Sequence, residues 1–580
     1  MITDDLRTQL NAWLADDPDE RDRAELTALA GDPSAAAQQE LSDRFARRLE
    51  FGTAGLRGAV AAGPNRMNRA VVRAATAALA RWLTDCAAAP EAPETLETLE
   101  ALETPETPET PEAAVVIGCD ARHRSADFAD EAARVLAGAG FRVYLLPAQQ
   151  PTPLLAFAVR HLSAASGIMI TASHNPAGDN GYKVYLKDGA QIVPPADAEI
   201  EAAISGLGPL SLIPLAPADS PLIVRLGDEV AKAYLDQVCP SFPATRDAAW
   251  LRFVYTPLHG VAGDLAMRAF EQAGFSLPDV VTAQLRPDPD FPSVLSPNPE
   301  EPESLDLALK LARGSGADLV IAHDPDGDRL AVAVPDPEVT GGWRRLTGDQ
   351  VGALLGAHLL DREAGLGDRL VVSTIVSSTL LARIAAAAGA RYVQTLTGFK
   401  WIARAADAYP GSRFVFGYEE ALGYEVGDTV RDKDGISAAL ALLDLAARCR
   451  SEGRALADAY DALEAAHGVH LTSQLSIDTV APAQLMARLR AVTPADLGGV
   501  TVTSVTDLTG GTAELPSADV LIYQLDGARV VVRPSGTEPK IKAYVEVVEP
   551  AFIRTLDEAR QAASDRMTPL REAVAALLAD

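Results

Sequence analysis

Three aspartates, Asp324, Asp326 and Asp328, alternate along one short segment between two apolar runs. Carboxylates this close together repel one another unless a cation or a basic side chain neutralises them. Their hard oxygen atoms suit Mg²⁺ or Ca²⁺ rather than Zn²⁺. An EF-hand is excluded, because its sixth position would be Arg329 instead of glycine and its twelfth Pro335 instead of glutamate. We predict a metal site with Arg329 as a donor to phosphate oxygens; the alternative is a solvated acidic turn in a β-hairpin.

A serine, Ser173, follows a second apolar run, residues 167–171, which predicts a buried strand. The strand ends where Pro176 forces a turn, so Ser173 lies on a loop of the kind that carries chemistry in α/β folds. A hydroxyl is a poor nucleophile until a base, a metal or a charged environment activates it. Three side chains are near enough in sequence to contribute: His174, Asp179 and Lys183. The alternative is a turn that only satisfies backbone groups.

The composition describes a folded chain with more than one core. The chain has 580 residues, of which 48% are hydrophobic and 23% charged, and this length predicts several domains. No run of about twenty apolar residues is present, and the acidic start lacks the apolar core of a signal peptide. Four scattered cysteines without a CxxC pair favour the reducing cytoplasm. The net charge of −29 argues against nucleic acid or an anionic membrane as a partner.

Alternating strand and helix patterns predict an α/β fold, and the last segment predicts an α+β domain. We expect four domains: a helical arm and first domain over residues 1–208, a second over 221–337, a third over 341–468 and a fourth over 470–580. Residues 87–112 interrupt the first domain with glutamate at every third position and a stretch of regularly spaced prolines. Such a segment is expected to be extended and solvated. We interpret it as an inert insertion rather than a partner-binding site.

Four motifs, in this order, resemble those of the α-D-phosphohexomutases. TASHNP at 171–176 resembles the phosphoserine loop, DPDGDR at 324–329 the Mg²⁺ loop, GYEEALGY at 417–424 the sugar-binding loop and RPSGTEPK at 533–540 the phosphate-binding loop. Three further segments look most like the branch of phosphopentomutases and glucose-1,6-bisphosphate-dependent phosphoglucomutases: FGTAGLRG at 51–58, TPLHG at 256–260 and TLTGFKW at 395–401. The resemblance implies three related mixed α/β domains around a central cleft, plus a C-terminal α+β domain.

The resemblance also implies roles for individual residues. Ser173 would be phosphorylated, and Mg²⁺ would be bound by Ser173, Asp324, Asp326 and Asp328. The remaining catalytic residues would be Arg57, Lys183 and Arg329, with Arg57 stabilising charge because an arginine is too basic to act as a general base. Substrate would be bound by His174, Thr397, Gly398, Lys400, Glu419 and Lys433, and the distal phosphate by Arg533, Ser535, Gly536, Thr537 and Lys542. We expect neither His174 nor His259 to act as a base.

A phosphosugar mutase is the function that the resemblance implies. It would interconvert sugar 1-phosphate and sugar 6-phosphate, with glucose as the first candidate and a sugar 1,6-bisphosphate as intermediate and activator. The sugar motif departs from the common Glu-x-Ser pattern at Ala421, and Lys540 and Lys542 lie near the place of a second arginine. A phosphomannomutase and a phosphopentomutase therefore remain alternatives, as do a phosphohydrolase and a silent sugar-phosphate sensor. A monomer or a homodimer is expected.

Overall fold

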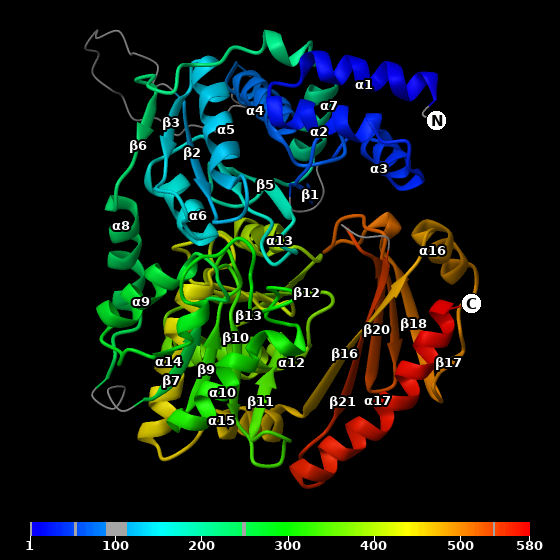
Figure 1. The fold of residues 1–580 in the computed structure, drawn as a ribbon. Helices are drawn as coiled ribbons and strands as arrows, with labels where there is room; N and C mark the ends of the chain where they lie inside the picture. Colours follow the sequence, from blue (N-terminus) through cyan, green and yellow to red (C-terminus); the bar gives the residue numbers. More distant parts are fainter. Residues whose placement is uncertain (1–2, 51–54, 89–112, 246–250, 537–539, 580) are drawn as a thin grey trace, which may run out of the picture. The chain divides into compact units, whose positions relative to one another are not determined.

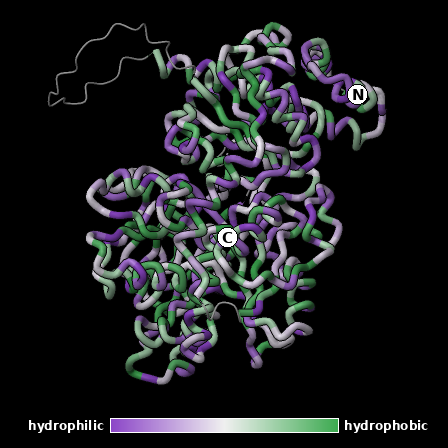
Figure 2. The backbone as a smooth tube through the Cα atoms, turned by 90° about the vertical axis from the view of Figure 1, so that its left-hand side faces the viewer, coloured by the Kyte–Doolittle hydropathy of each residue, from purple (hydrophilic) through white to green (hydrophobic). Residues whose placement is uncertain are grey.

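The computed structural model describes the chain except for residues 1–2, 51–54, 89–112, 246–250, 537–539 and 580. The chain, drawn as a ribbon in Figure 1, divides into two compact units. The first unit contains residues 1–234, 259–262 and 286–298, and the second contains residues 235–258, 263–285 and 299–580. In the part of the chain that the structure describes, no helix combines the length and apolar character needed to cross a membrane. Hydrophilic and hydrophobic stretches alternate along the backbone in Figure 2.

Three N-terminal helices open the first unit: α1 (Asp4–Asp16), α2 (Glu20–Gly31) and α3 (Ala35–Phe45). Each begins at a side chain that accepts a hydrogen bond from the first turn, Thr3, Asp19 and Ser34 respectively, as helix N-termini require. Their apolar faces meet around Leu10, Leu26 and Leu41. The three helices therefore share a small apolar core of their own.

The first sheet is mixed, with the order β1-β5-β4-β2-β3-β6. Its strands are β1 (Leu56–Ala59), β2 (Ala114–Cys119), β3 (Arg142–Leu145), β4 (Ser166–Ile170), β5 (Asp179–Leu186) and β6 (Ile223–Arg225). Strands β4, β2, β3 and β6 are parallel to one another, whereas β5 lies antiparallel between β4 and β1, so that β5 alone is reversed in this sheet. The alternation of strands and helices in the sequence did not predict the reversed strand β5. The serine loop is short and joins β4 to β5, so the chain must return antiparallel beside β4.

Helices cover both faces of this sheet. One face shares a core with α4 (Arg69–Ala88), α5 (Ser125–Gly138) and α7 (Ala196–Ser205). On the other face lies α6 (Thr152–His161), where Leu155 packs against the glycines of β2 and β4. Helix α4 continues to Ala88, two residues into the segment predicted as an insertion; residues 89–112 of that prediction lie outside the described residues.

The second sheet, in the second unit, has the order β11-β10-β9-β7-β8. Its strands are β7 (Phe253–Thr256), β8 (Asp279–Val280), β9 (Leu319–Ala322), β10 (Ala331–Pro335) and β11 (Trp343–Leu346). Helices α9 (Ala262–Ala273) and α10 (Asp306–Ser315) accompany it, and α8 (Glu229–Val238) runs from the first unit into the second. Because β9 and β10 are antiparallel neighbours, the segment between them is a hairpin connection.

The third sheet has the order β13-β12-β14-β15. Its strands are β12 (Arg369–Thr374), β13 (Arg391–Thr395), β14 (Arg413–Glu419) and β15 (Gly423–Val426). Five helices belong to this part: α11 (Gly348–Arg362), α12 (Leu380–Ala387), α13 (Phe399–Ala405), α14 (Gly435–Ser451) and α15 (Leu456–His467). The segment 417–424, expected as a loop, is a β-hairpin in which only residues 420–422 form the turn.

The fourth sheet is antiparallel throughout, with the order β16-β21-β20-β19-β18-β17. Its strands are β16 (Val469–Asp478), β17 (Asp496–Leu497), β18 (Val500–Asp507), β19 (Leu521–Leu525), β20 (Ala528–Pro534) and β21 (Lys540–Glu549). Helices α16 (Pro482–Ala491) and α17 (Leu556–Ala579) share its core, and α17 runs along the sheet in Figure 1. The predicted α/β class with a C-terminal α+β part is confirmed.

Candidate active site

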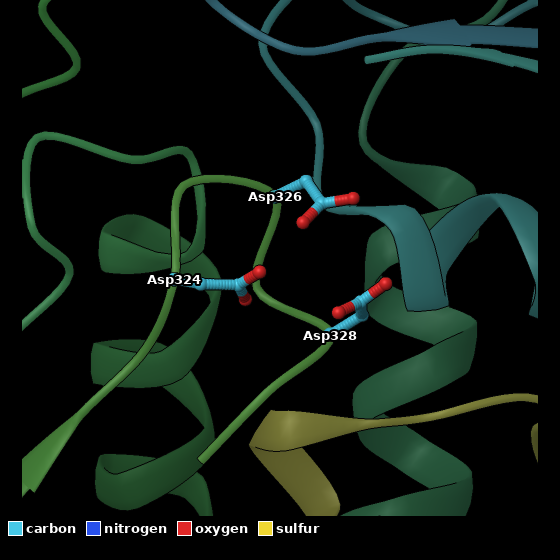
Figure 3. Close-up of side chains that lie close together, drawn as sticks. All are labelled: Asp324, Asp326 and Asp328. Atoms are coloured by element: carbon cyan, nitrogen blue, oxygen red, sulfur yellow. The ribbon is translucent and has the colours of Figure 1, made fainter. Parts of the chain in front are cut away.

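The three aspartates of the β9–β10 connection form a buried acidic cluster. Asp324, Asp326 and Asp328 each offer a carboxylate oxygen, and these atoms lie within 4.8 Å of one another. The side chains converge in Figure 3, and none of the three residues is more than 1% exposed. Burial and the two neighbouring carboxylates raise the pKa of Asp324 well above its ordinary value. The solvated acidic turn is therefore wrong, and this buried set of hard oxygens fits Mg²⁺.

Gly327, inside the DPDGDR motif, positions this loop together with two residues for which no role was predicted, His323 and Gly435. Gly327 makes the tight turn with a φ of 72°, and the Nδ1–H of His323 donates to the carbonyl of Arg329 over 2.8 Å. Burial lowers the pKa of His323 to about 4, so its ring is neutral. Gly435, at the start of α14, approaches so closely that a Cβ there would lie 2.4 Å from the Arg329 oxygen. The signals in the sequence were the histidine before Asp324 and the glycine that ends RDKDG.

Two basic side chains accompany the acidic cluster. Lys433 Nζ lies 3.5 Å from Asp328 Oδ2, and Arg329 Nη1 lies 3.1 Å from Glu300 Oε2. Glu419 is buried nearby; burial raises its pKa, and the charges of Lys433 and Arg329 oppose that rise. The sequence predicted these residues in separate loops, and the structure brings them together within the second unit.

The hairpin of β14 and β15 is joined directly to the metal loop. Leu330 N–H donates to the Leu422 carbonyl over 3.1 Å. Gly423 leaves room for the Lys433 side chain, whose Cδ would lie 2.3 Å from a Cβ at that glycine. A glycine is therefore needed here for the lysine to reach the acidic cluster.

The first residue of the β14–β15 turn, Glu420, has an unusual charge environment. Its Oε2 accepts hydrogen bonds from the hydroxyls of Thr374 and Ser377, over 3.4 and 3.2 Å. Burial, together with Glu419, raises the pKa of Glu420 to about 7. In this motif the sequence singled out Glu419 and the departure at Ala421, and Glu420 was missed as a titratable group.

The predicted substrate loop leads into α13. Gly398 precedes the helix with a φ of 113°, a conformation that favours glycine. Lys400 is buried and its Nζ lies 5.9 Å from the centre of the Trp401 ring. Within the described part of the chain, the buried hydroxyl of Thr397 has no hydrogen-bond partner, which leaves it able to bind a ligand.

The predicted phosphate clamp lies at the end of the β20–β21 hairpin. Arg533 and Lys542 are register partners on these two strands, and Arg533 Nη2 donates to the Tyr544 hydroxyl over 3.0 Å. The N–H of Ser535 donates to the carbonyl of Lys540 over 2.8 Å. Gly536 is exposed, and Thr537 lies outside the described residues. Two cations on neighbouring strands, Arg533 and Lys542, form an arrangement suited to phosphate.

The serine loop belongs to the first unit. Ser173 is 3% exposed and has a φ of 53°, a left-handed conformation that is uncommon for a residue with a side chain. Its Oγ lies 3.2 Å from His174 Nδ1, and its N–H donates to the Thr171 hydroxyl over 2.9 Å. Arg57 Nη1 donates to Asn175 Oδ1 on the same loop over 2.9 Å.

Two more residues of the prediction lie in this unit. Lys183 is buried on β5, and its register partner is Met169 of β4, the strand that leads into the serine loop. His259 is also buried, 2.7 Å from the Ser293 hydroxyl, and burial lowers its pKa. The front half of the motif 51–58 lies outside the described residues, whereas Arg57 is described.

Four segments match the four successive domains described for the phosphoglucomutase/phosphomannomutase family. The α/β/α domains I, II and III match residues 99–208, 232–340 and 347–466, and the C-terminal domain matches residues 485–562. The chain belongs to this family. The family resemblance inferred from the motifs is thereby confirmed, and the chain is a phosphosugar mutase, an isomerase. The family depends on Mg²⁺, which agrees with the buried acidic cluster.

Individual relatives within the family carry different substrate names. The probable phosphomannomutase of Haemophilus influenzae is 43% identical over 75% of this chain and 88% of its own length. The probable phosphoribomutase of Schizosaccharomyces pombe is 36% identical over 93% of each chain. The phosphoglucomutase of Staphylococcus epidermidis is 34% identical over 88% of this chain and 92% of its own. Membership of the family therefore leaves mannose, ribose and glucose phosphates as candidate substrates.

Proposed function

We propose that this mutase interconverts glucose 1-phosphate and glucose 6-phosphate through a phosphorylated Ser173 and a glucose 1,6-bisphosphate intermediate. The observation that carries the proposal is the buried cluster of three aspartates with Lys433 and Arg329 beside it. Phosphomannomutase and phosphopentomutase activity are the alternatives, because relatives carry those names. Four free cysteines suit the reducing cytoplasm, which we include in the proposal.

Two phosphoryl transfers make up the proposed reaction. In the first, the free hydroxyl of the sugar phosphate attacks the phosphoserine, its O–P bond forms, the Ser173 Oγ–P bond breaks and the hydroxyl proton is lost. In the second, Ser173 Oγ forms a bond to the other phosphorus of the bisphosphate, the bond between that phosphorus and the sugar oxygen breaks, and the released oxygen takes up a proton. Mg²⁺ bound by Ser173, Asp324, Asp326 and Asp328 would withdraw charge from the transferring group.

The other residues would bind and orient the sugar phosphate and neutralise the charge of its phosphate groups. Lys183 would carry the proton of the attacking hydroxyl, and Arg57 would stabilise charge on the phosphoryl oxygens. The phosphate remote from the reaction would be bound by Arg533, Ser535, Gly536, Thr537 and Lys542. The sugar would be oriented by His174, Thr397, Gly398, Lys400, Glu419 and Lys433. Both orientations of the bisphosphate need the same distal clamp, which is a reason for the separate cationic turn on β20–β21.

The proposal is tested by replacing the serine. Ser173→Ala should abolish turnover of glucose 1-phosphate while leaving the melting temperature nearly unchanged, because one loop hydroxyl adds little to a large core. Ser163→Ala is the matched control, since Ser163 is an exposed serine with a φ of 52° and should stay active. Intact-mass and peptide analysis should find a phosphoryl group on the wild-type Ser173 peptide only. Normal turnover by Ser173→Ala would refute the proposal.

The preferred sugar is identified by comparing turnover of glucose, mannose, ribose and deoxyribose 1-phosphates. Arg533→Ala should weaken binding of all of them by a similar factor, because the distal phosphate is shared. Losing a charge-assisted hydrogen bond costs about 1.5–3 kcal/mol, or roughly one to two powers of ten in affinity. Glu419→Ala should affect the sugars unequally, because ring hydroxyls differ among them. Arg413→Ala, at an exposed arginine, is the control. If Arg533→Ala changed the ranking of sugars and Glu419→Ala did not, the two assignments would be reversed.

A further inference from the structure

We propose that Arg122 is a positioning residue that holds the backbone of the serine loop in its reactive conformation. This inference rests on the proposed role of Ser173 as the phosphorylated nucleophile. Arg122 follows β2 and lies outside the four motifs that indicated the chemistry. Its side chain is fully buried in the first unit.

The guanidinium of Arg122 donates four hydrogen bonds to backbone carbonyls of the serine loop. Nη2 donates to the carbonyls of Ser173 and Asn175, each over 2.6 Å. Nη1 donates to the carbonyls of Pro176 and Asp179, over 2.7 and 3.2 Å. The two terminal nitrogens carry four hydrogens in a rigid planar fork, so all four are used on one loop.

The guanidinium is itself held from the other side. Asp120 Oδ2 lies 3.4 Å from Arg122 Nε, and the guanidinium stacks over the ring of Phe291 at 5.0 Å. Asp120 Oδ1 accepts from the Ser125 hydroxyl over 2.6 Å, and Asn180, on β5, donates to that hydroxyl. These contacts hold the Arg122 side chain in place, and its hydrogen bonds in turn hold the backbone of the serine loop.

The backbone conformation of the serine loop needs stabilising contacts of this kind. Ser173 has a left-handed backbone conformation, which persists only where surrounding contacts enforce it. Its carbonyl is one of the four acceptors, so Arg122 acts on the nucleophile's own residue. In a reaction with phosphoryl transfer in both directions, a displacement of Oγ by about 1 Å would be expected to slow turnover roughly a hundredfold.

The test replaces two neighbouring arginines in the same conservative way. Arg122→Lys keeps the positive charge beside Asp120 but offers one ammonium with three donors, which cannot span four carbonyls. Arg124→Lys is the matched control, because Arg124 pairs with Asp19 and Asp22 of the N-terminal arm instead of with the serine loop. Measurements are kcat and KM for glucose 1-phosphate, and hydrogen–deuterium exchange of the peptide covering residues 171–180.

We expect Arg122→Lys to lower kcat about a hundredfold with KM within threefold of wild type, and to speed exchange in residues 171–180. Arg124→Lys should leave kcat and exchange in that peptide unchanged. Wild-type kcat and exchange in Arg122→Lys would mean that Arg122 only balances the charge of Asp120, and would overturn the proposal. An equal loss of kcat in both variants would overturn it too. If Ser173→Ala retained activity, the proposed function would fail, and the exchange comparison would still decide whether Arg122 holds the loop.

Discussion

Several ionisable side chains in the second unit are buried, and burial changes their pKa values. Asp324 is held with a raised pKa by its two neighbours and by burial, and Lys433 approaches Asp328 from a distant part of the chain. Glu420, next to Glu419 in the same unit, has a pKa raised to about 7. A partly buried carboxyl whose hydrogen-bond donors are the neutral hydroxyls of Thr374 and Ser377 is favoured in its neutral form, so Glu420 links stability to pH.

Glu420→Gln should therefore change how stability depends on pH. The carboxyl has a pKa near 4.5 when unfolded and about 7 when folded, so its neutral form favours folding. That contribution is complete below pH 4.5 and is lost as pH rises through 7. Glutamine stays neutral at every pH. On going from pH 5 to pH 8, the free energy of unfolding of the variant should therefore rise relative to that of wild type by up to about 3 kcal/mol, at 1.36 kcal/mol per pKa unit.

Calorimetric melting curves at pH 5 and pH 8 measure this difference. The exposed residue Glu514 supplies the control, Glu514→Gln, which should follow wild type at both values. Parallel curves for Glu420→Gln and wild type would mean that Glu420 is already charged at pH 5 in the folded protein.

At the scale of elements, two hairpins and one helix start build the metal end of the site. The β9–β10 connection carries the aspartates, the β14–β15 hairpin bonds to it through Leu330 and Leu422, and α14 begins against it at Gly435. Each contact is backbone against backbone, or backbone against a glycine. Such contacts leave no room to adjust when an atom is added.

Gly435→Ala should consequently disturb the metal loop. The added Cβ would lie 2.4 Å from the Arg329 oxygen and 2.8 Å from the Gly327 oxygen, so backbone must shift. We expect Mg²⁺ affinity, measured by calorimetric titration, to fall about tenfold or more, the range seen when residues that orient metal ligands are lost. Gly314→Ala on α10 is the matched control, because nothing lies within 4 Å of its added Cβ.

That control should bind Mg²⁺ like wild type and gain about 0.5–1 kcal/mol in stability, as alanine does over glycine inside a helix. Unchanged Mg²⁺ affinity in Gly435→Ala would show that the start of α14 does not position the aspartates.

At the scale of the whole molecule, the net charge is negative, whereas a site that binds anionic substrates needs positive charge. The chain carries a net charge of −29, whereas its substrates are anions. The predicted site residues supply local cations, among them Lys183, Arg329, Lys433 and Arg533. A local positive field within an acidic protein can attract an anion while the remaining surface keeps the protein dispersed.

The acidic insertion is the part of the sequence that we expect the fold to need least. Replacing residues 89–112 by a short flexible joiner between α4 and β2 should leave kcat and melting temperature nearly unchanged. Loop-closure entropy varies slowly with length, by about 0.6 kcal/mol per doubling. A same-length replacement by a glycine–serine segment is the control for the loss of its glutamates. A large drop in melting temperature on deletion would show that this segment packs against the folded part.

Local sequence determined the chemistry of this protein, because the features that reveal it are short-range. The spacing of Asp324, Asp326 and Asp328, the turn after the strand at 166–170 and the alternation of strands and helices all follow from neighbouring residues. Only the tertiary structure decided that the aspartates are buried and that Lys433 reaches Asp328. The positioning contacts of Arg122 and Gly435 likewise join segments far apart in the chain. Such contacts depend on how elements pack, and no local spacing encodes them.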